Sequence, residues 1–245
     1  MHKPTNPSLE AFCFDSEPLK VWDAADEELL AIRSLMRRAF LDPGTGMRGV
    51  TESEVDRMLH TDTDQAFIES IQQPAMAFAE VDPITGEPTV NQMFAHRRIN
   101  RAYDNSGNLA GAIISADNTS GTPLERGFKM ALTPRLPLPQ SMNKRYLHNR
   151  ITVVDPEYQR RGIGARLLWE AMRGKPDRQR VTAYSWQDLL PMVPDELGKA
   201  GFIKTPGDQE VRLFSTERIV VQQRYESGVG TVRQKVTEAI ERHQK

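Results

Sequence analysis

A strand-like run passes directly into a helix-like run at Val153–Met172, "VVDPEYQRRGIGARLLWEAM", and this junction limits the fold more than any other stretch of the chain. The residues between the two runs read "QRRGIG", with two arginines and two glycines. The first turn of a helix has unpaired backbone N–H groups and partial positive charge, which a phosphate can satisfy. Glycines at Gly162 and Gly164 let a phosphate approach the backbone and allow positive φ angles. The junction therefore predicts a phosphate-binding turn, and the alternative is a tight strand-to-helix turn with a solvated basic edge.

Two better-known phosphate motifs are absent from this junction. A dinucleotide-binding fingerprint needs a third glycine, and in "GIGARL" that position is Leu167. A P-loop needs Gly-Lys followed by Ser or Thr, and the chain contains no such run. The residues alone therefore leave the identity of the phosphate ligand open.

Helical and strand-like patterns alternate along the whole chain. Apolar residues at three- and four-residue spacing predict a helix from a cap at Asp23 or Asp26 to about Phe40. Thr51, with Glu54 three residues later, predicts the start of a helix that continues in pieces to about residue 72. Strand patterns occur at "PAMAFAEVD", in a hairpin with "NSG" at its tip, and at "RYLHNRITVV", "RVTAYSW", "EVRLFST" and "ERIVVQQRY". This mixture predicts an α/β or α+β fold with a mixed sheet.

The chain of 245 residues is interpreted as one large domain with an extension at each end. Residues 1–18 are polar and contain prolines, so we expect a poorly fixed N-terminal arm. The main domain is expected at residues 19–216. Residues 217–245 form a C-terminal extension whose helix has one apolar stripe, which would dock onto the domain or onto a second subunit in a homodimer. Residues 117–143 predict a long, proline-rich loop beside a binding site.

Charge and cysteine content restrict the partners and the compartment. The net charge of −1 gives no support to nucleic acid as a partner, because nucleic-acid-binding proteins usually present a basic surface. Cys13 is the single cysteine, so no disulfide forms within the chain, which is typical of a reducing compartment. Neither a run of 18 apolar residues nor a signal-peptide pattern occurs. We therefore expect no membrane span and a cytoplasmic location, with the nucleus as the alternative.

The junction resembles the acyl-CoA signature of the GCN5-related N-acetyltransferase (GNAT) superfamily. That signature is Val-x-Pro-x-Tyr-Gln/Arg-x-x-Gly-x-Gly/Ala followed by an apolar helix, and "VVDPEYQRRGIGARLL" fills each of its positions. A second match follows in order: "ELGKAGFI", at Glu196–Ile203, resembles the late helix of the family that ends in Lys-x-Gly-Phe. Together the resemblance covers residues 19–216 and is strongest at residues 148–203.

The resemblance implies a GNAT-like acyl-CoA N-acyltransferase fold, in which helices flank a central, splayed, mostly antiparallel sheet. It also implies acetyl-CoA as co-substrate and no metal. In this fold the strand Ile151–Val154 pairs with the pantetheine arm and splays from the strand Val181–Trp186, and the thioester lies in the gap. Backbone N–H groups of the turn hold the CoA pyrophosphate. The implied CoA-binding residues are Thr152, Val153, Val154, Gln159, Arg160, Arg161, Gly162, Ile163, Gly164 and Ala165.

Acetyl transfer needs a base, because an ammonium group has no lone pair with which to attack. The resemblance points to His148, at the position where the histone-modifying branch of the family carries a glutamate and the arylalkylamine branch a histidine. Even spacing along a strand predicts that His148 shares a face with Thr152 and Val154. Histidine titrates near neutral pH, which suits this role. The alternatives are Glu80 or His96 as the base, or a histidine at position 148 that only packs and hydrogen-bonds.

The acid is the point at which the chain departs from the family pattern. Most members place a tyrosine four residues before the glycine of Gly-Phe, and this chain has Leu197 there. Tyr184, on the preceding strand, is the candidate proton donor to the leaving thiolate, and Ser185 is an alternative that would act through water. A core aromatic role for Tyr184 is the competing interpretation. Without an acid, the thiolate leaves unprotonated or takes a proton from water.

The resemblance thus implies an enzyme that transfers an acetyl group from acetyl-CoA to a primary amine by direct attack in a ternary complex. We expect the amine of a small molecule or metabolite, because no added recognition module is evident in the sequence. Acetylation of a protein or peptide amine is one alternative. The other is a regulatory protein that binds CoA without turnover, an interpretation that rests only on Leu197.

Overall fold

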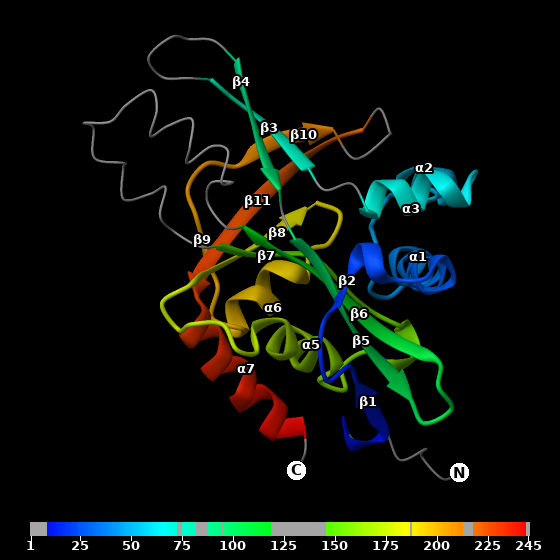
Figure 1. Cartoon of the computed structure of the whole chain (residues 1–245), viewed down its shortest axis with the longest axis vertical. Coiled ribbons are helices and arrows are strands. Elements are labelled where there is room, and N and C mark those ends of the chain that lie inside the picture. Colours follow the sequence, from blue (N-terminus) through cyan, green and yellow to red (C-terminus); the bar gives the residue numbers. More distant parts are fainter. Residues whose placement is uncertain are drawn as a thin grey trace.

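The computed structural model describes residues 9–72, 75–81, 88–94, 96–118, 146–186, 188–212 and 218–243. A mixed sheet runs through the molecule with helices on both of its faces (Figure 1). The helices are α1 (Asp26–Leu41), α2 (Glu52–Met58), α3 (Asp64–Gln72), α5 (Ile163–Met172), α6 (Val193–Lys199) and α7 (Val229–His243). The strands are β1 (Phe12–Phe14), β2 (Leu19–Lys20), β3 (Ala75–Val81), β4 (Pro88–Phe94), β5 (His96–Asp104), β6 (Leu109–Asn118), β7 (Tyr146–Val154), β8 (Arg180–Trp186), β9 (Ile203–Lys204), β10 (Gln209–Arg212) and β11 (Ile219–Gly228).

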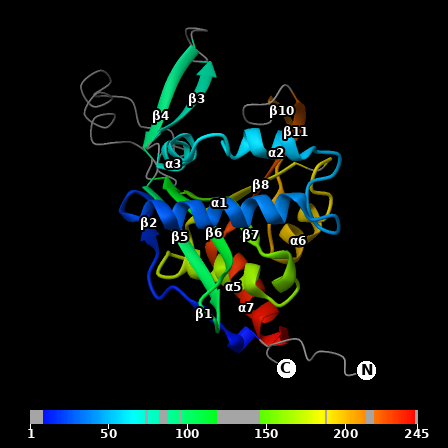
Figure 2. The same cartoon turned by 90° about the vertical axis from the view of Figure 1, so that its right-hand side faces the viewer.

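The main sheet has nine described strands in the order β1-β5-β6-β7-β8-β11-β10, with β2 also paired to β5 and β9 to β11. Among the described pairs, β7 and β8 are parallel, and the others are antiparallel. The strands β3 and β4 form a separate hairpin that projects from one end of the molecule (Figure 2). The predicted fold class, a mostly antiparallel mixed sheet flanked by helices, is confirmed.

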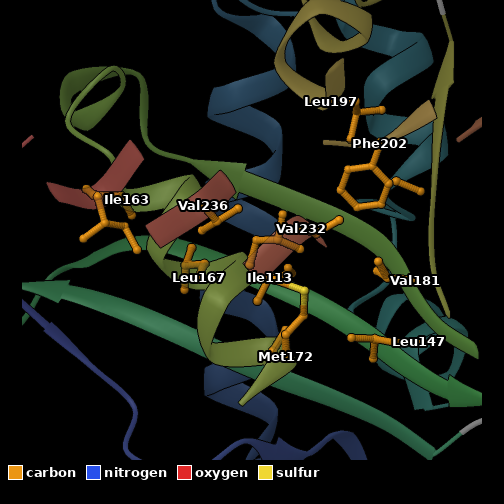
Figure 3. Packing of buried hydrophobic residues seen from close by; sticks show 14 of the residues in the cluster. Ile113, Leu147, Ile163, Leu167, Met172, Val181, Leu197, Phe202, Val232 and Val236 are labelled. Carbon is orange, nitrogen blue, oxygen red and sulfur yellow. The ribbon is translucent and has the colours of Figure 1, made fainter. Parts of the chain in front are cut away.

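Two apolar cores lie on opposite faces of the sheet. Helix α1 crosses one face, together with α2 and α3, while α5 and α7 lie on the other (Figure 2). Figure 3 shows the second core, in which Leu167 and Met172 of α5 and Val232 and Val236 of α7 gather around Ile113 of β6. The two faces are called the α1 face and the α5 face below. The side chains of each central strand alternate between them.

The two predicted helix starts have different outcomes. Thr51 caps α2: its hydroxyl accepts from the Glu54 N–H at 3.2 Å, and the Glu54 carboxylate accepts from the Thr51 N–H at 2.8 Å, which confirms the capping box. The predicted Asp cap of α1 is wrong, because Ala25 is the N-cap and Asp26 is already helical. Glu28 instead reaches back to accept from the Ala25 N–H at 2.9 Å. The acidic first turn of α1 suits the helix dipole without a side-chain cap.

The described part of the expected N-terminal arm, from residue 9 onward, is not poorly fixed. Strand β1 pairs with β5, and the Asp15 carboxylate accepts from both the Nε and the backbone N–H of Arg101, each at 2.9 Å. The backbone carbonyl of Ser16 accepts from Arg173 of α5 at 2.7 Å. Residues 12–16 are therefore tied to the sheet and to α5 by contacts with residues far along the chain, which local composition does not reveal.

The expected boundary at residue 216 falls inside the sheet. Strand β11 pairs with β8 over seven residues, so the sheet continues beyond that point. Val232 and Val236 of α7 are fully buried in the same core as α5. Arg233 of α7 also donates to the carbonyl oxygens of Met172 and Lys175, at 3.0 and 2.6 Å, at the C-terminal end of α5. The apolar stripe of the last helix thus docks onto its own domain.

Some sequence-based expectations lie at the limits of the described residues. Residues 119–145, which make up most of the expected loop at 117–143, are outside the described part of the chain. The side chains of Glu80 and His96, the two alternative bases, are also outside it. Across the described ranges, no helix has the length and hydrophobicity needed to cross a membrane.

If α7 is part of the domain core, Val232→Ala should lower the free energy of unfolding by about 2 kcal/mol, because a fully buried side chain is truncated. Chemical denaturation monitored by circular dichroism would measure this change. Gln234→Ala, at an exposed position of the same helix, is the matched control and should change stability by less than ~0.5 kcal/mol. Equal effects of the two substitutions would contradict the docking of α7.

Candidate functional site

The turn between β7 and α5 is shaped as a nest of backbone N–H groups. Arg160 and Gly162 both have left-handed backbone angles, with φ of 62° and 82°, and α5 begins at Ile163. Within the described residues, the backbone N–H groups from Arg160 to Ala165 donate to no backbone carbonyl, and the first to do so is that of Arg166, to the Gly162 oxygen at 2.9 Å. Such a concave set of donors at a helix N-terminus can bind an anion.

Asp155 fixes the position of this turn. Its carboxylate accepts from the Glu157 N–H at 3.1 Å and from the guanidinium of Arg38 on α1 at 2.6 and 3.0 Å. Its backbone N–H donates to the Ala110 carbonyl at 2.9 Å. The amide of Gln159 donates to the Val154 carbonyl at 3.3 Å, so this motif residue also braces the turn from within.

Tyr158 is the second brace of the turn. Its hydroxyl donates to Asp104, the last residue of β5, at 2.8 Å, and its ring and that of Phe12 of β1 pack edge to face with centroids 5.4 Å apart. Arg161 lies over the Tyr158 ring at 5.2 Å and donates to the Glu157 carbonyl at 2.8 Å. The guanidinium of Arg161 therefore contacts other residues of the turn itself. Arg160 is exposed, and no hydrogen bond between described residues ties its side chain.

Gly164 lies beside the end of β7. A Cβ atom built on Gly164 would meet the Cγ2 atoms of Val154 and Thr152 at 3.7 and 4.0 Å, which is ordinary van der Waals contact. Packing within the protein therefore does not require glycine here, and its absent side chain leaves room over the turn. The buried side chains of Ile163 and Val153 point into the two opposite cores, so these two residues can offer only backbone groups to a ligand.

The strands β7 and β8 splay apart next to this turn. Their parallel pairing runs from Tyr146, opposite Arg180, to Asn149, opposite Ala183, and ends there. Beyond that point β7 continues to Val154 with pairing to β6 alone among the described strands. The edge of β7 that faces β8 is thus open at residues 151–154, and its backbone N–H and C=O groups can pair with an extended ligand. This is the predicted splay.

A β-bulge in β7 overturns the predicted placement of His148. The register with β6 passes from Ile151, opposite Ile114, to Asn149, opposite Ser115, so Arg150 has no opposite residue. One extra residue reverses the alternation of side chains on the two sides of the bulge. Leu147 before the bulge and Val154 after it both face the α5 core, whereas Val153 belongs to the α1 core. His148 therefore lies on the α1 face, opposite to Thr152 and Val154.

The same reversal brings His148 and Tyr184 to one face. His148 lies opposite Thr182 of β8, and its Nδ1 is 2.5 Å from the Thr182 hydroxyl oxygen. Val181 and Ala183 face the α5 core, so Thr182 and the half-buried Tyr184 face the α1 side together with His148. Ser185 alternates to the opposite face and is buried, which separates it from His148. Leu197 is also buried, packed in the α5 core with Phe202 (Figure 3).

Three residues that shape the site carry no signal in the sequence. Arg38, Asp104 and Phe12 contact the turn across 117, 54 and 146 positions of sequence, respectively. None belongs to the signature that marks the turn. A search for charged or aromatic residues near the motif would have missed them, because only the folded sheet brings them there.

A further hollow, of about 630 Å³, is lined by residues of α2 and of the segment that follows it, and by none of the turn. Carboxylates of Glu52 and Asp56 line it together with His60, and both carboxylates pair with Arg37. Among the described residues, no group of three or more His, Cys, Asp or Glu side chains is placed to hold a metal ion.

No protein-family model matches the chain, and no curated protein matches its sequence. Among solved structures, the spermidine/spermine N-acetyltransferase SpeG of Vibrio cholerae aligns at 12% identity over 94% of this chain and 98% of its own, with a TM-score of 0.45. The NatC complex bound to Gag peptide and CoA aligns at 11% identity over 89% and 98%, with a TM-score of 0.46. An acetyltransferase related to the histone acetyltransferase HPA2, from Corynebacterium glutamicum, aligns at 11% identity over 85% and 94%, with a TM-score of 0.45. Likenesses at this level do not carry the chemistry of those proteins over to this chain.

The brace at Tyr158 predicts a pH dependence. Hydrogen bonds from the Asn108 side chain first, and then from the Tyr158 hydroxyl, lower the pKa of Asp104 to about 2. A carboxyl group whose pKa is lowered by folding stabilises the fold at pH values above its ordinary pKa. This contribution is lost as the pH falls from about 4 towards 2. Tyr158→Phe should raise the pKa of Asp104 part of the way, since Asn108 remains.

Carboxyl-detected NMR titration measures this pKa directly. Tyr225→Phe removes a hydroxyl that donates to Gln223, in another part of the sheet, and should leave the Asp104 titration unchanged. An identical titration of Asp104 in the Tyr158→Phe variant and the unaltered protein would contradict the brace.

Proposed function

We propose that the chain is an acetyl-CoA-dependent N-acetyltransferase of the GNAT superfamily. The observation that carries the proposal is that an open strand edge and a turn with unpaired backbone N–H groups lie side by side, since a Cβ atom built on Gly164 would be in contact range of Val154 and Thr152. An open strand edge suits an amide-containing arm, and the turn suits a pyrophosphate. CoA carries a pantetheine arm with two amides next to a pyrophosphate, so a single ligand matches both features.

In this proposal the residues of the turn divide into contact and support. The backbone N–H groups from Arg160 to Ala165 donate hydrogen bonds to the pyrophosphate oxygens, and the exposed guanidinium of Arg160 adds positive charge. Thr152 and Val154 line the pantetheine path, and Val153 contributes its backbone. Gln159 and Arg161 keep the shape of the turn, as their hydrogen bonds to the Val154 and Glu157 carbonyls indicate.

The proposed reaction is direct transfer in a ternary complex. An ammonium substrate loses a proton to His148 through water, and the neutral nitrogen attacks the thioester carbon. A C–N bond forms and the C–S bond breaks, so the sulfur leaves with the bonding electron pair as a thiolate. The nitrogen of the tetrahedral intermediate passes its excess proton to water, and Tyr184, the proposed donor, protonates the thiolate and regains a proton from water. Holding both substrates in the splay supplies much of the rate by proximity.

The proposed acceptor is the primary amine of a small molecule or metabolite. Peptide or protein amines are the first alternative, and CoA binding without turnover is the second. Leu197 keeps the second alternative in consideration, because a buried leucine cannot donate a proton. Free-thiol release from acetyl-CoA, measured with parallel panels of small amines and peptides, separates the three. Thermal stabilisation by CoA without thiol release would favour the regulatory alternative, and no stabilisation at all would refute the proposal.

The first test concerns the phosphate turn. Gly164→Glu places a carboxylate at the second position of α5, where the pyrophosphate would lie. The helix dipole favours an acidic residue there and the site has room for a Cβ atom, so stability should be retained. CoA affinity, measured by isothermal titration calorimetry, should fall roughly 100-fold or more, because charge-assisted hydrogen bonds are lost and like charge is introduced.

Ser53→Glu is the matched control, because it makes the same charge change at the second position of α2, at an exposed site. It should bind CoA as the unaltered protein does. If both variants bind CoA equally well, the turn of α5 does not hold the pyrophosphate.

The second test concerns the base. His148→Gln should lower kcat/KM for acetyl transfer about 100-fold near neutral pH, the usual contribution of a positioned base. The loss should shrink above the pKa of the amine substrate, where the amine is already neutral. CoA affinity should stay unchanged, since His148 lies on the face opposite to Thr152 and Val154. Steady-state rates from pH 6 to about 10 measure this, and a pH-independent loss would remove His148 from proton transfer.

A further inference from the structure

We infer that Thr182 is a positioning residue that fixes which ring nitrogen of His148 carries the proton. Thr182 lies directly opposite His148 in the parallel pair of β7 and β8, and its Oγ1 is 2.5 Å from the His148 Nδ1. Its side chain is fully buried, with 0% of the residue exposed. The hydroxyl that meets Nδ1 is therefore itself shielded from solvent, whereas the His148 ring is half-buried.

Of the two residues opposite His148 on the neighbouring strands, Thr182 is the polar one. On the β6 side, the residue opposite His148 is Ala116, whose buried side chain cannot hydrogen-bond. On the β8 side it is Thr182. Next in the same row, Glu226 of β11 lies opposite Thr182, and its carboxylate accepts from Arg180 at 2.7 Å and Arg224 at 3.1 Å. These charged groups bind one another across the sheet, whereas the contact at Nδ1 is made by a neutral hydroxyl.

The direction of the hydrogen bond decides the chemistry of the ring. In neutral imidazole one nitrogen carries hydrogen and the other a lone pair, and the partner of one sets the state of the other. If the Nδ1–H donates to the Thr182 oxygen, the lone pair lies on Nε2. A base that takes a proton through Nε2 requires this tautomer. The same hydroxyl oxygen can still accept from Nδ1–H once the ring is protonated, so no partner has to change during proton transfer.

The contact between Thr182 and Nδ1 is independent of the proposed function, whereas the choice of Nδ1–H rests on it, because a base that acts through Nε2 requires that tautomer. The placement also depends on the β7 bulge. Without the extra residue at Arg150, even spacing would put His148 on the same face as Thr152 and Val154. The last paired rows of β7 and β8 thus hold the base next to the point at which the strands separate.

The test measures the tautomer directly. Long-range ¹H–¹⁵N NMR spectra of the unaltered protein at high pH, with His148 assigned by its loss in His148→Gln, should show hydrogen on Nδ1. Thr182→Val keeps the shape of the side chain and removes the acceptor, so the hydrogen should move to Nε2. Thr182→Ser should restore Nδ1–H. Thr61→Val, which removes a hydroxyl that donates to the Asp56 carbonyl far from the site, should leave the His148 spectrum unchanged.

The rate of acetyl transfer should change in the same variants as the tautomer of His148. With an amine substrate found in the panel assay, Thr182→Val should lower kcat about 10-fold, the loss expected for one hydrogen bond, and Thr182→Ser should recover most of it. Hydrogen on Nε2 in the unaltered protein, or an unchanged tautomer in Thr182→Val, would overturn the inference. If no amine releases thiol while the tautomer behaves as stated, the proposed function fails and the role of Thr182 in fixing the ring stands.

Discussion

The extra residue in β7 at Arg150 is the feature on which the candidate site depends. It reverses the alternation of side chains, so that Leu147 and Val154 face the same core although seven positions separate them. The pairing with β8 ends at the adjacent row, and the remaining edge of β7 opens beside the start of α5. A regular strand would keep His148 on the face of Thr152 and Val154. One backbone irregularity therefore sets the face on which the proposed base lies, next to the point at which β7 and β8 separate.

The turn after β7 holds its shape through contacts that come from distant parts of the chain. Arg38 of α1 donates to Asp155, while Asp104 accepts from the Tyr158 hydroxyl and Phe12 packs against the Tyr158 ring. These contacts explain why left-handed backbone angles persist there, since strained conformations survive only where surrounding structure imposes them. Of the two arginines of the motif, Arg161 donates to the Glu157 carbonyl within the turn, and Arg160 is exposed.

Burial on the α5 face integrates both ends of the chain into one unit. The last helix packs against α5 through Val232 and Val236, and the first strand joins the sheet through β5. Helix α5 is therefore held along one side by α7 and at its N-terminal end by the braced turn. A helix that presents backbone donors to an anion gains from such support, because the donors are positioned before the ligand arrives.

Sequence alone was sufficient for the features that local patterns encode. The strand-turn-helix at Val153–Met172 and the capping box at Thr51 were predicted correctly, because periodicity, capping and glycine placement act over a few residues. The mostly antiparallel arrangement of the sheet was also predicted correctly, but from the family resemblance of the motif. The CoA ligand and the catalytic residues remain proposals. Tertiary structure decided the face of His148, its pairing with Thr182 and the docking of both ends of the chain. A bulge changes which face each side chain takes, and it is visible only in the register between two strands. Folding also brings together residues more than a hundred positions apart. Neither effect can be predicted from residue spacing along a single strand.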